Sequence, residues 1–354
     1  MLFGDTASIS TAQNIERKIK WIPSYTLESG IGFSDNPLYG PYTREEANFL
    51  ENSLEGFFLI QTKPEYFSYL YLYGEGKIYE ELTEHKTTSI YLGQFEHAYT
   101  PTGSKETYGF RLRHTFYDQG FDFSELGLPY SLSVQSNNSE MYAYLSNKFS
   151  DELTTVIEFS LGSENFREIT DDNKDKGISV AVKGTPDFLN WTLETEYLQK
   201  KYKERSKRNW DAALISGGEL ETEKLNFSLT TEKEYDALPF ENSRAKFMWS
   251  TLQDNGGGYY NYDKISLLLK QELLISSCEI ELTIGGSKTK YDKRVTDSGK
   301  VFERRSLTNG LSITRKISED LDVYFRWSRE EDFSNSRGYE YFSNFLSTGI
   351  IWEI

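Results

Sequence analysis

Hydrophobic and polar residues alternate one by one along most of this chain, and this alternation strongly limits the folds it can adopt. Segments 153–162, 278–285 and 321–328 each place apolar residues at one parity and polar, often charged, residues at the other. Successive side chains of a β-strand point to opposite sides, so a period of two indicates strands with one apolar and one polar face. No window of ten or more residues has a comparable helical period. The chain is therefore predicted to be all-β.

Turn residues divide the alternating segments into about sixteen strands. They are predicted near 21–34, 47–62, 65–79, 86–99, 105–117, 139–149, 152–166, 174–183, 188–202, 218–231, 241–253, 260–274, 277–291, 300–316, 320–331 and 339–354. The strand at 65–79 and the turn at 232–240 have the weakest boundaries, so between about fourteen and eighteen strands remain open.

Connections of two lengths alternate between these strands. Short turns, such as Ser150-Asp151, alternate with long polar connections at 34–46, 118–138 and 203–217. An even number of strands joined alternately by short and long connections is typical of a transmembrane antiparallel up-and-down β-barrel. A soluble β-sandwich explains the alternating faces equally well but gives no reason for connections that alternate in length.

The composition favours a barrel with a wet interior over a soluble domain. Hydrophobic residues make up 37% of the chain, below the roughly 45–50% of soluble domains, whereas 25 Tyr and 23 Phe raise the aromatic share to 15%. A transmembrane barrel needs apolar side chains only in a belt about 25 Å tall, flanked by aromatic residues. Disorder would explain the low hydrophobicity, but the many aromatic residues argue against it.

Several other classes are excluded. No apolar run approaches the roughly 18 residues of a membrane-spanning helix, and the single Cys278 rules out a disulfide framework. A net charge of −16 argues against a nucleic-acid partner. Residues 1–20 lack a basic stretch followed by an apolar one, so they are not a signal peptide. Export would require that Met1 was added to a mature form or that the natural start lies further upstream.

The chain ends in a strand with a recognisable pattern. In Ser347–Ile354, Gly349 is followed by the aromatic Trp352 and the terminal hydrophobic Ile354. Trp352 and Ile354 share one face with Leu346 in an extended backbone. This pattern resembles the closing strand of bacterial outer-membrane barrels, which the barrel-assembly machinery recognises. Gly349, Trp352 and Ile354 are therefore the expected assembly signal, although most such barrels end in Phe.

Two further stretches resemble the same group. Gly32–Leu38 and Gln253–Tyr260, together with Gly349–Ile354, look similar to segments of bacterial outer-membrane porins. The resemblance implies a barrel over residues 21–354 after an N-terminal periplasmic segment, residues 1–20. It further implies location in the bacterial outer membrane, with outer-membrane lipid, lipopolysaccharide and the barrel-assembly machinery as partners. It carries no residue-level functional assignment.

If the apolar parity faces lipid, the opposite parity lines a water-filled lumen. A dry core could not hold so many unpaired charges, since burying each one costs several kcal/mol. The predicted pore-lining residues are Arg111, Arg113, Asp118, Asp122, Glu125, Glu158, Glu194, Glu196, Lys270, Glu272, Glu279, Glu281, Arg315, Asp322 and Arg326.

Asp118, Asp122 and Glu125 belong to the longest predicted connection, 118–138. In sixteen-stranded general porins, the connection at this ordinal position folds into the channel. One hypothesis is therefore that these carboxylates narrow the lumen opposite a basic wall of Arg111 and Arg113. An acidic external loop is an equally good alternative. Because acidic residues exceed basic ones in the inferred lumen, weak cation preference is expected.

Catalytic and metal-binding motifs are scarce. His85, His97 and His114 lie apart, without a second histidine or cysteine at metal-ligand spacing, and no G-x-S-x-G motif occurs. The segment 171–182 imitates a calcium loop but lacks the glycine at its required position and ends in Val182 rather than Glu. The glycines at 256–258 lack the lysine of a phosphate loop. No catalytic residue, cofactor or metal is therefore predicted.

The sequence thus predicts a non-enzymatic, porin-like channel for passive diffusion of small hydrophilic solutes. An outer-membrane enzyme, a plugged binding or assembly barrel and, less favoured, a soluble β-sandwich binding protein remain alternatives. The transported solute and a homo-oligomeric state are left open.

Overall fold

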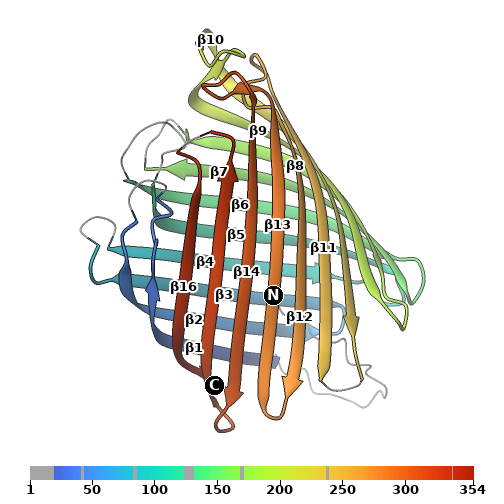
Figure 1. Ribbon diagram of the computed structural model, residues 1–354. Helices are drawn as coiled ribbons and strands as arrows, with labels where there is room; N and C mark the ends of the chain where they lie inside the picture. Colours follow the sequence, from blue (N-terminus) through green and yellow to red (C-terminus); the bar gives the residue numbers. More distant parts are fainter. Residues whose placement is uncertain are drawn as a thin grey trace.

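Sixteen strands, all antiparallel, close into one barrel in the computed structural model, which describes residues 20–40, 44–82, 86–122, 131–167, 171–236, 239–336 and 338–354. Within these ranges the side chains of 20–22, 61–62, 120–122 and 131–133 are not described. Each strand pairs with its neighbours in sequence, and β1 pairs with β16 (Figure 1).

The strands are listed here in chain order. They are β1 Lys20–Ser34, β2 Ala47–Lys63, β3 Tyr66–Tyr79, β4 Thr87–Tyr99, β5 Glu106–Asp122, β6 Ser131–Lys148, β7 Leu153–Phe166, β8 Asn173–Gly184, β9 Asn190–Arg208, β10 Leu214–Glu234, β11 Phe240–Asp254, β12 Tyr262–Ile275, β13 Cys278–Val295, β14 Val301–Lys316, β15 Leu321–Ser334 and β16 Tyr341–Glu353.

The predicted all-β, up-and-down architecture is confirmed, but two predicted connections are wrong. The connection placed at 118–138 spans only 123–130, because Asp118 pairs with Gln135 and the ladder continues to Asp122 and Ser131. The connection placed at 203–217 spans only 209–213. Runs of consecutive polar residues, such as 135–140 and 203–208, interrupt the alternation by which the other strands were recognised. The β9–β10 hairpin projects beyond the rest of the barrel at the top of Figure 1.

One parity of each strand faces the interior. Tyr324 of β15 donates a hydrogen bond of 2.8 Å to Glu51 of β2, and Arg111 of β5 contacts Glu158 of β7 at 2.8 Å. These strands are not neighbours in the sheet, so their side chains meet through the lumen. Residues paired in the ladder share a face, and this assigns an inner and an outer parity to every strand.

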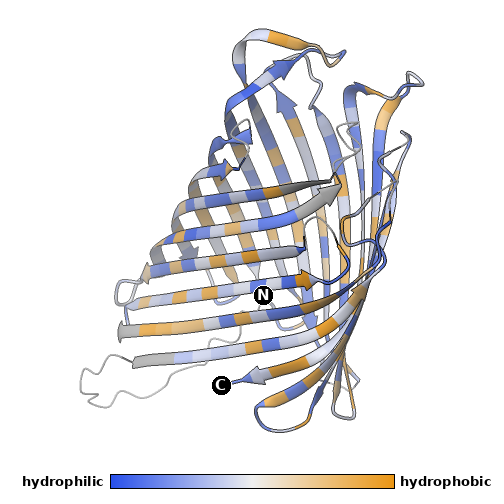
Figure 2. Cartoon of the chain, turned by 90° about the vertical axis from the view of Figure 1, so that its left-hand side faces the viewer, coloured by the Kyte–Doolittle hydropathy of each residue, from blue (hydrophilic) through white to orange (hydrophobic). Residues whose placement is uncertain are grey.

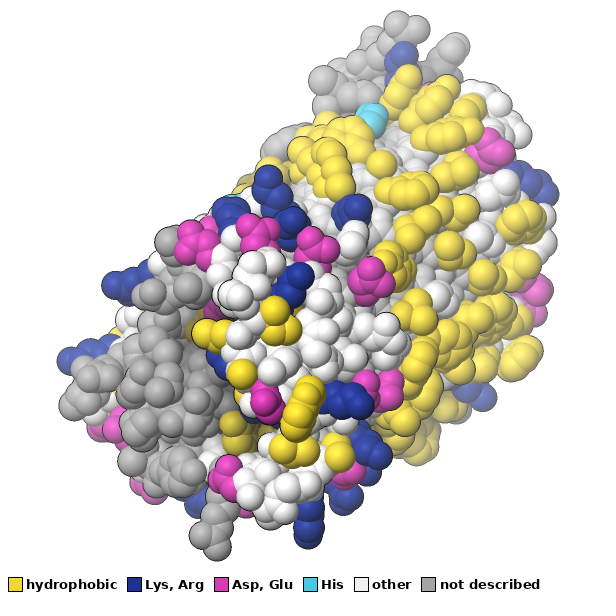
Figure 3. All heavy atoms as spheres, turned by 90° about the horizontal axis from the view of Figure 1, so that it is seen from above, with side chains coloured by type: hydrophobic (Ala, Val, Ile, Leu, Met, Phe, Trp, Pro, Cys, Tyr) yellow, Lys and Arg dark blue, Asp and Glu magenta, His cyan; other side chains and the backbone are white. Residues whose placement is uncertain are grey.

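The outer parity carries the apolar belt. Ile31, Phe159 and Ile284 remain 64%, 58% and 55% exposed. Orange and blue segments alternate along the strands in Figure 2, and in Figure 3 hydrophobic side chains cover the outer wall on the right, with few charged ones among them. Burying such surface in a hydrocarbon phase stabilises the barrel because about 25 cal/mol is gained per Å² removed from water.

No helix among the described residues is long and apolar enough to span a membrane.

The barrel closes where β1 meets β16, with Gly30 opposite Gly349. A Cβ atom at Gly349 would lie 2.2 Å from the carbonyl oxygen of Ser29, and one at Gly30 would lie 2.1 Å from the Tyr324 hydroxyl. Both glycines are therefore required at this close approach, where Tyr324 covers the junction. Backbone hydrogen bonds between Tyr25 and Ile354 extend the pairing to the last residue.

Candidate functional site

Most of the predicted pore-lining residues lie on the inner face. The ladder register places them there in every strand concerned. They are Arg111, Arg113, Glu158, Glu194, Glu196, Lys270, Glu272, Glu279, Glu281, Asp322 and Arg326.

Two predicted pore-lining residues face outward. Arg315 pairs with Cys278 and Val323 on the outer face at the end of β14 nearest the termini, where the apolar belt has ended. Asp118 pairs with Ser89 on the outer face of β5, and its carboxylate accepts a hydrogen bond of 2.8 Å from the Gln135 amide. These two placements were wrong because water contacts both faces of a strand beyond the belt.

The other two acidic residues of the predicted constriction cannot be placed in the lumen. Asp122 ends β5, but its side chain is not described, and Glu125 lies outside the described residues. The strands that flank them continue the wall as a ladder from Asp118 to Asp122.

Arg111 and Arg113 do not form a free basic wall. Arg111 contacts Glu96 at 3.1 Å and Glu158 at 2.8 Å. Glu96 also accepts hydrogen bonds of 2.8 Å from the hydroxyls of Tyr69 and Tyr144. The sequence-based prediction missed Glu96 and the two tyrosines that donate to it. The network is held by charge-assisted hydrogen bonds, which are about twice as strong as neutral ones.

Arg113 is also bound to neighbours on both sides. Its guanidinium donates two hydrogen bonds to Gln94, of 2.9 and 2.8 Å, lies 3.9 Å from Glu140, and covers the ring of Tyr142 at 5.7 Å. Its charge is thus largely matched within the wall.

Two more predicted residues form pairs across the lumen surface. Lys270 lies 2.6 Å from Glu281 and 3.1 Å from Glu272. Arg326 makes a bidentate pair with Glu28, at 2.8 and 3.0 Å, which closes the junction of β1 and β15 across β16. Glu28 was not among the predicted residues, although its parity on β1 is opposite to that of Leu27 and could have identified it.

A tyrosine-rich wall on β3 was missed. Tyr69, Tyr71 and Tyr73 share the inner parity with Glu75 and Lys77. Tyr73 donates a hydrogen bond of 2.6 Å to Glu75, and Lys77 lies 3.5 Å from the same carboxylate. In this stretch Tyr alternates with Leu. Because tyrosine is itself partly hydrophobic, the inner positions did not stand out from the outer ones as polar.

The residues that follow β1, 35–40, turn into the barrel at the end opposite the termini. Asn36, only 1% exposed, anchors it. Its amide nitrogen donates hydrogen bonds to the carbonyls of Gly40 at 3.0 Å and Phe342 at 2.9 Å, and its amide oxygen accepts one from Gly40 N–H at 2.8 Å. Ser343 donates to the Asn36 carbonyl at 2.7 Å. We call residues 35–40 the inward segment.

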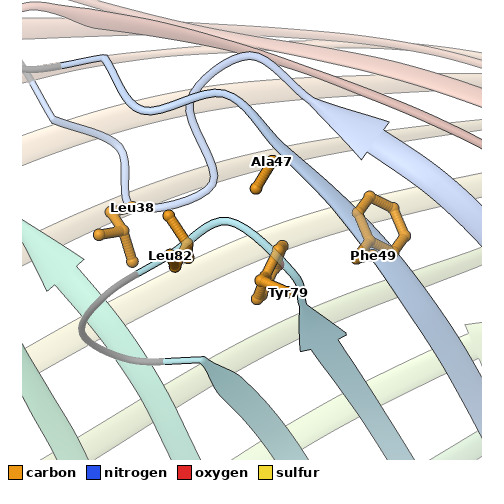
Figure 4. Close-up of a cluster of buried hydrophobic side chains, with 5 residues drawn as sticks. All are labelled: Leu38, Ala47, Phe49, Tyr79 and Leu82. Carbon is orange, nitrogen blue, oxygen red and sulfur yellow. The ribbon is translucent and has the colours of Figure 1, made fainter.

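Apolar packing against β2 and β3 also holds the inward segment in place. Leu38 lies in a buried cluster with Leu82 from the β3–β4 connection and with Ala47, Phe49 and Tyr79 from the inner faces of β2 and β3 (Figure 4). The cluster joins two connections and two strands, so the inward segment is packed against the wall.

Tyr39 forms the tip of the inward segment. Its backbone has φ of 56°, a left-handed conformation that costs about 1–2 kcal/mol for a residue with a side chain. The ring lies 5.3 Å from that of Tyr341 and 6.0 Å from that of Phe345. Burial, together with the neighbouring Glu330 carboxylate, raises the pKa of the Tyr39 hydroxyl well above its ordinary value. Tyr39 is therefore a neutral group.

A cavity of about 510 Å³ lies beside Tyr39, between β1–β3 and β13–β16. Its lining combines aromatic rings with five carboxylates and two cations. The carboxylates belong to Glu28, Glu51, Glu75, Glu281 and Glu330, and the cations to Lys77 and Arg326. Lys77 covers the rings of Phe49 and Phe345 at 5.4 and 5.5 Å. The cavity is thus acidic overall.

The inner faces of β10, β11 and β12 carry cations together with the carboxylates of Glu232, Glu234, Asp254 and Glu272. Lys224, Arg244, Lys246 and Lys264 face the lumen there. None of the four forms an ion pair with a carboxylate among the residues that the structure describes. The lumen therefore has an acidic, tyrosine-rich side and a side on which unpaired cations lie among carboxylates.

Carboxylates of the calcium-like segment are already bound to cations. Asp171 lies 3.1 Å from Arg205, and Asp172 lies 2.9 Å from Lys203. Within the described parts of the chain, no three His, Cys, Asp or Glu side chains group closely enough to hold a metal ion.

Comparison with known proteins gives likeness in fold only. No protein-family model and no curated protein matches the chain. OccAB1 of Acinetobacter baumannii is similar in structure, with a TM-score of 0.52 and 9% sequence identity, over 94% of this chain and 96% of that one. OccAB4 of the same organism has a TM-score of 0.51 and 7% identity over 94% and 98%.

CdiB from Acinetobacter baumannii has a TM-score of 0.51 and 9% identity. It matches over 97% of this chain, which spans 61% of CdiB. These neighbours share the overall fold with this chain. At these identities the likeness establishes the fold.

Proposed function

We propose that this chain forms a channel in a bacterial outer membrane through which small hydrophilic solutes diffuse passively. The hydration of the charged inner wall carries the proposal. The inward-facing pair Lys270 and Glu281 keeps 32% and 40% of its side-chain surface exposed, inside a closed barrel whose outer face is apolar. Barrels of this strand number leave an aqueous channel. The termini would lie at the periplasmic end and the inward segment at the external end.

We propose weak cation preference on the basis of the cavity beside Tyr39. Five carboxylates and two cations line it, so the potential at this end of the lumen is negative. Lys224 and its basic neighbours lie on the far side and moderate the preference. The resulting transverse field favours small polar solutes over apolar ones.

Recording in a planar bilayer tests both parts. The purified protein should give discrete conductance steps, and reversal potentials in a salt gradient should indicate cation preference. The double variant Glu75→Gln, Glu330→Gln should reduce that preference, whereas Lys246→Gln should increase it. Absence of conductance would overturn the channel, and anion selectivity in the intact protein would overturn the cation preference.

We also propose that β16 is the segment that the barrel-assembly machinery recognises. Pairing of Ile354 with Tyr25 and the close approach at Gly349 support a role in closure. Deleting Trp352–Ile354 in cells that export the chain should leave it in the periplasm, unassembled. Normal insertion of the truncated chain, judged by membrane fractionation, would contradict this proposal.

A further inference from the structure

The outer wall has a hollow that the channel does not use. A groove of about 1020 Å³ crosses the outer face, and apolar side chains from β3 to β7 line its floor, among them Leu70, Leu112, Met141 and Leu161. Small residues at outer positions leave this space open. A Cβ at Gly93 would meet nothing closer than Leu72, at 3.7 Å. The groove therefore results from the side-chain pattern of the sheet.

One end of the groove is basic. Lys174 and Lys176 lie on the outer face of β8 and line it together with Lys201 of β9. Lys174 and Lys201 are directly opposite each other in the ladder, an arrangement that is destabilising for like charges. Glu219 and Glu221 compensate Lys201, at 3.3 and 3.1 Å.

Lys174 and Lys176 are not compensated in this way. Both are exposed, and neither forms an ion pair with a carboxylate in the parts of the chain that the structure covers. The next outward residue along β8 is Ile178, 39% exposed, which belongs to the apolar belt. The two ammonium groups thus stand at the border of the belt, at the end of the barrel opposite the termini.

Neutral polar groups lie beside the lysines: Ser163 is directly opposite Lys174 in the ladder, and Gln199 is directly opposite Lys176. Ser139, Ser163, Gln199 and His114 all line the groove. The Ser139 hydroxyl and His114 Nδ1 lie 2.9 Å apart. The groove thus brings two exposed cations, several hydrogen-bonding groups and an apolar surface together, with Lys176 directly opposite Leu161.

A molecule that carries phosphates, hydroxyl groups and acyl chains would satisfy all three kinds of group in the groove. Phosphates would contact Lys174 and Lys176, sugar hydroxyls would contact the serine, glutamine and histidine side chains, and acyl chains would cover Leu112, Met141 and Leu161. We propose that the groove binds a phosphorylated glycolipid of the external leaflet. The inference rests on the proposed function only in assuming that the barrel spans an outer membrane.

The chain offers a matched control. Lys288 and Lys290 lie on the outer face of β13 at the same end of the barrel, and neither lines the groove. Lys288 is paired with Glu303 at 3.2 Å. Replacing these two lysines changes the net charge by the same amount without touching the groove.

Native mass spectrometry of the full chain in a non-ionic detergent tests the proposal, with synthetic bisphosphorylated lipid A as the probe. The double variant Lys174→Gln, Lys176→Gln should bind the probe about tenfold more weakly, and Lys288→Gln, Lys290→Gln should bind it as the unchanged chain does. The dephosphorylated probe should bind the unchanged chain as weakly as the first variant binds the phosphorylated one. Gly93→Leu, which fills the hollow and keeps the lysines, should also weaken binding.

Equal loss in both double variants would mean that net charge, and not the groove, attracts the lipid, and the proposal would fail. Equal binding of the phosphorylated and dephosphorylated probes, or a protein dimer that covers the groove, would overturn it as well. Conductance of the same preparations is recorded in parallel. Because the lysines lie outside the lumen, the lipid result and the channel result are read separately.

Discussion

At one end of the barrel, the residues that follow β1 and the paired ends of β5 and β6 behave in opposite ways. Residues 35–40 turn inward and bring Tyr39 into the lumen beside Glu330. By contrast, β5 and β6 remain paired as far as Asp122 and Ser131 and extend the wall. The difference shows that polar, acidic composition does not separate a segment that turns inward from one that continues the wall.

The two segments differ instead in the contacts that hold them in place. The inward segment has a buried asparagine bonded to the backbone of β16 and a leucine in an apolar cluster. In the described parts of β5 and β6 beyond the belt, Asn137 is exposed. The hydrogen bond from Gln135 to Asp118 joins these two adjacent strands to each other. The four predictions that follow test this contrast.

The largest effect on stability is expected at Asn36. Asn36→Ala leaves Gly40 N–H and the Phe342 carbonyl without their partners in a buried site, and should lower the free energy of unfolding by about 2–4 kcal/mol. Asn137→Ala, an exposed asparagine of the β5–β6 extension, should change it by less than about 0.5 kcal/mol. Urea titration of folding into detergent micelles measures both. Similar values for the two variants would remove the proposed anchor.

A smaller effect should appear at high pH. Because the pKa of Tyr39 is raised in the folded protein, its stabilising contribution is complete below the unfolded pKa of about 10 and is lost as pH rises above it. Between pH 8 and pH 11 the unchanged chain should lose about 1 kcal/mol more than Tyr39→Phe does. Urea titrations at the two pH values provide the comparison, and identical losses would show that the Tyr39 hydroxyl is not buried.

A difference of about 1 kcal/mol is expected between two substitutions of Tyr39. Glycine accepts the left-handed backbone at this position without strain, whereas alanine does not. Tyr39→Gly should therefore be more stable than Tyr39→Ala, while both remove the ring from the lumen. If alanine were equally stable, the segment would have to adopt a different backbone conformation.

The strands and the faces of their residues can be predicted only where apolar and polar residues alternate along the sequence. Within the belt, residues such as Ile157 and Glu158 differ in chemistry because one faces out and the other in, and so the strands there could be predicted from the alternation. Beyond the belt both faces contact water, so Asp118 and Arg315 carried no information about the side they face. The inward segment depends on contacts between Asn36 and Phe342, which are 306 positions apart, and no local pattern encodes them.

Single-channel conductance of two shortened chains tests the central contrast most directly. In one, an Asn-Gly turn replaces residues 35–46 and joins the paired residues Ser34 and Ala47; in the other, the same turn replaces 119–134 and joins Asp118 to Gln135. The first chain should conduct clearly more than the unshortened protein, because the inward segment no longer narrows the lumen. The second should conduct as the unshortened protein does. A larger conductance in the second chain, with none in the first, would contradict the account.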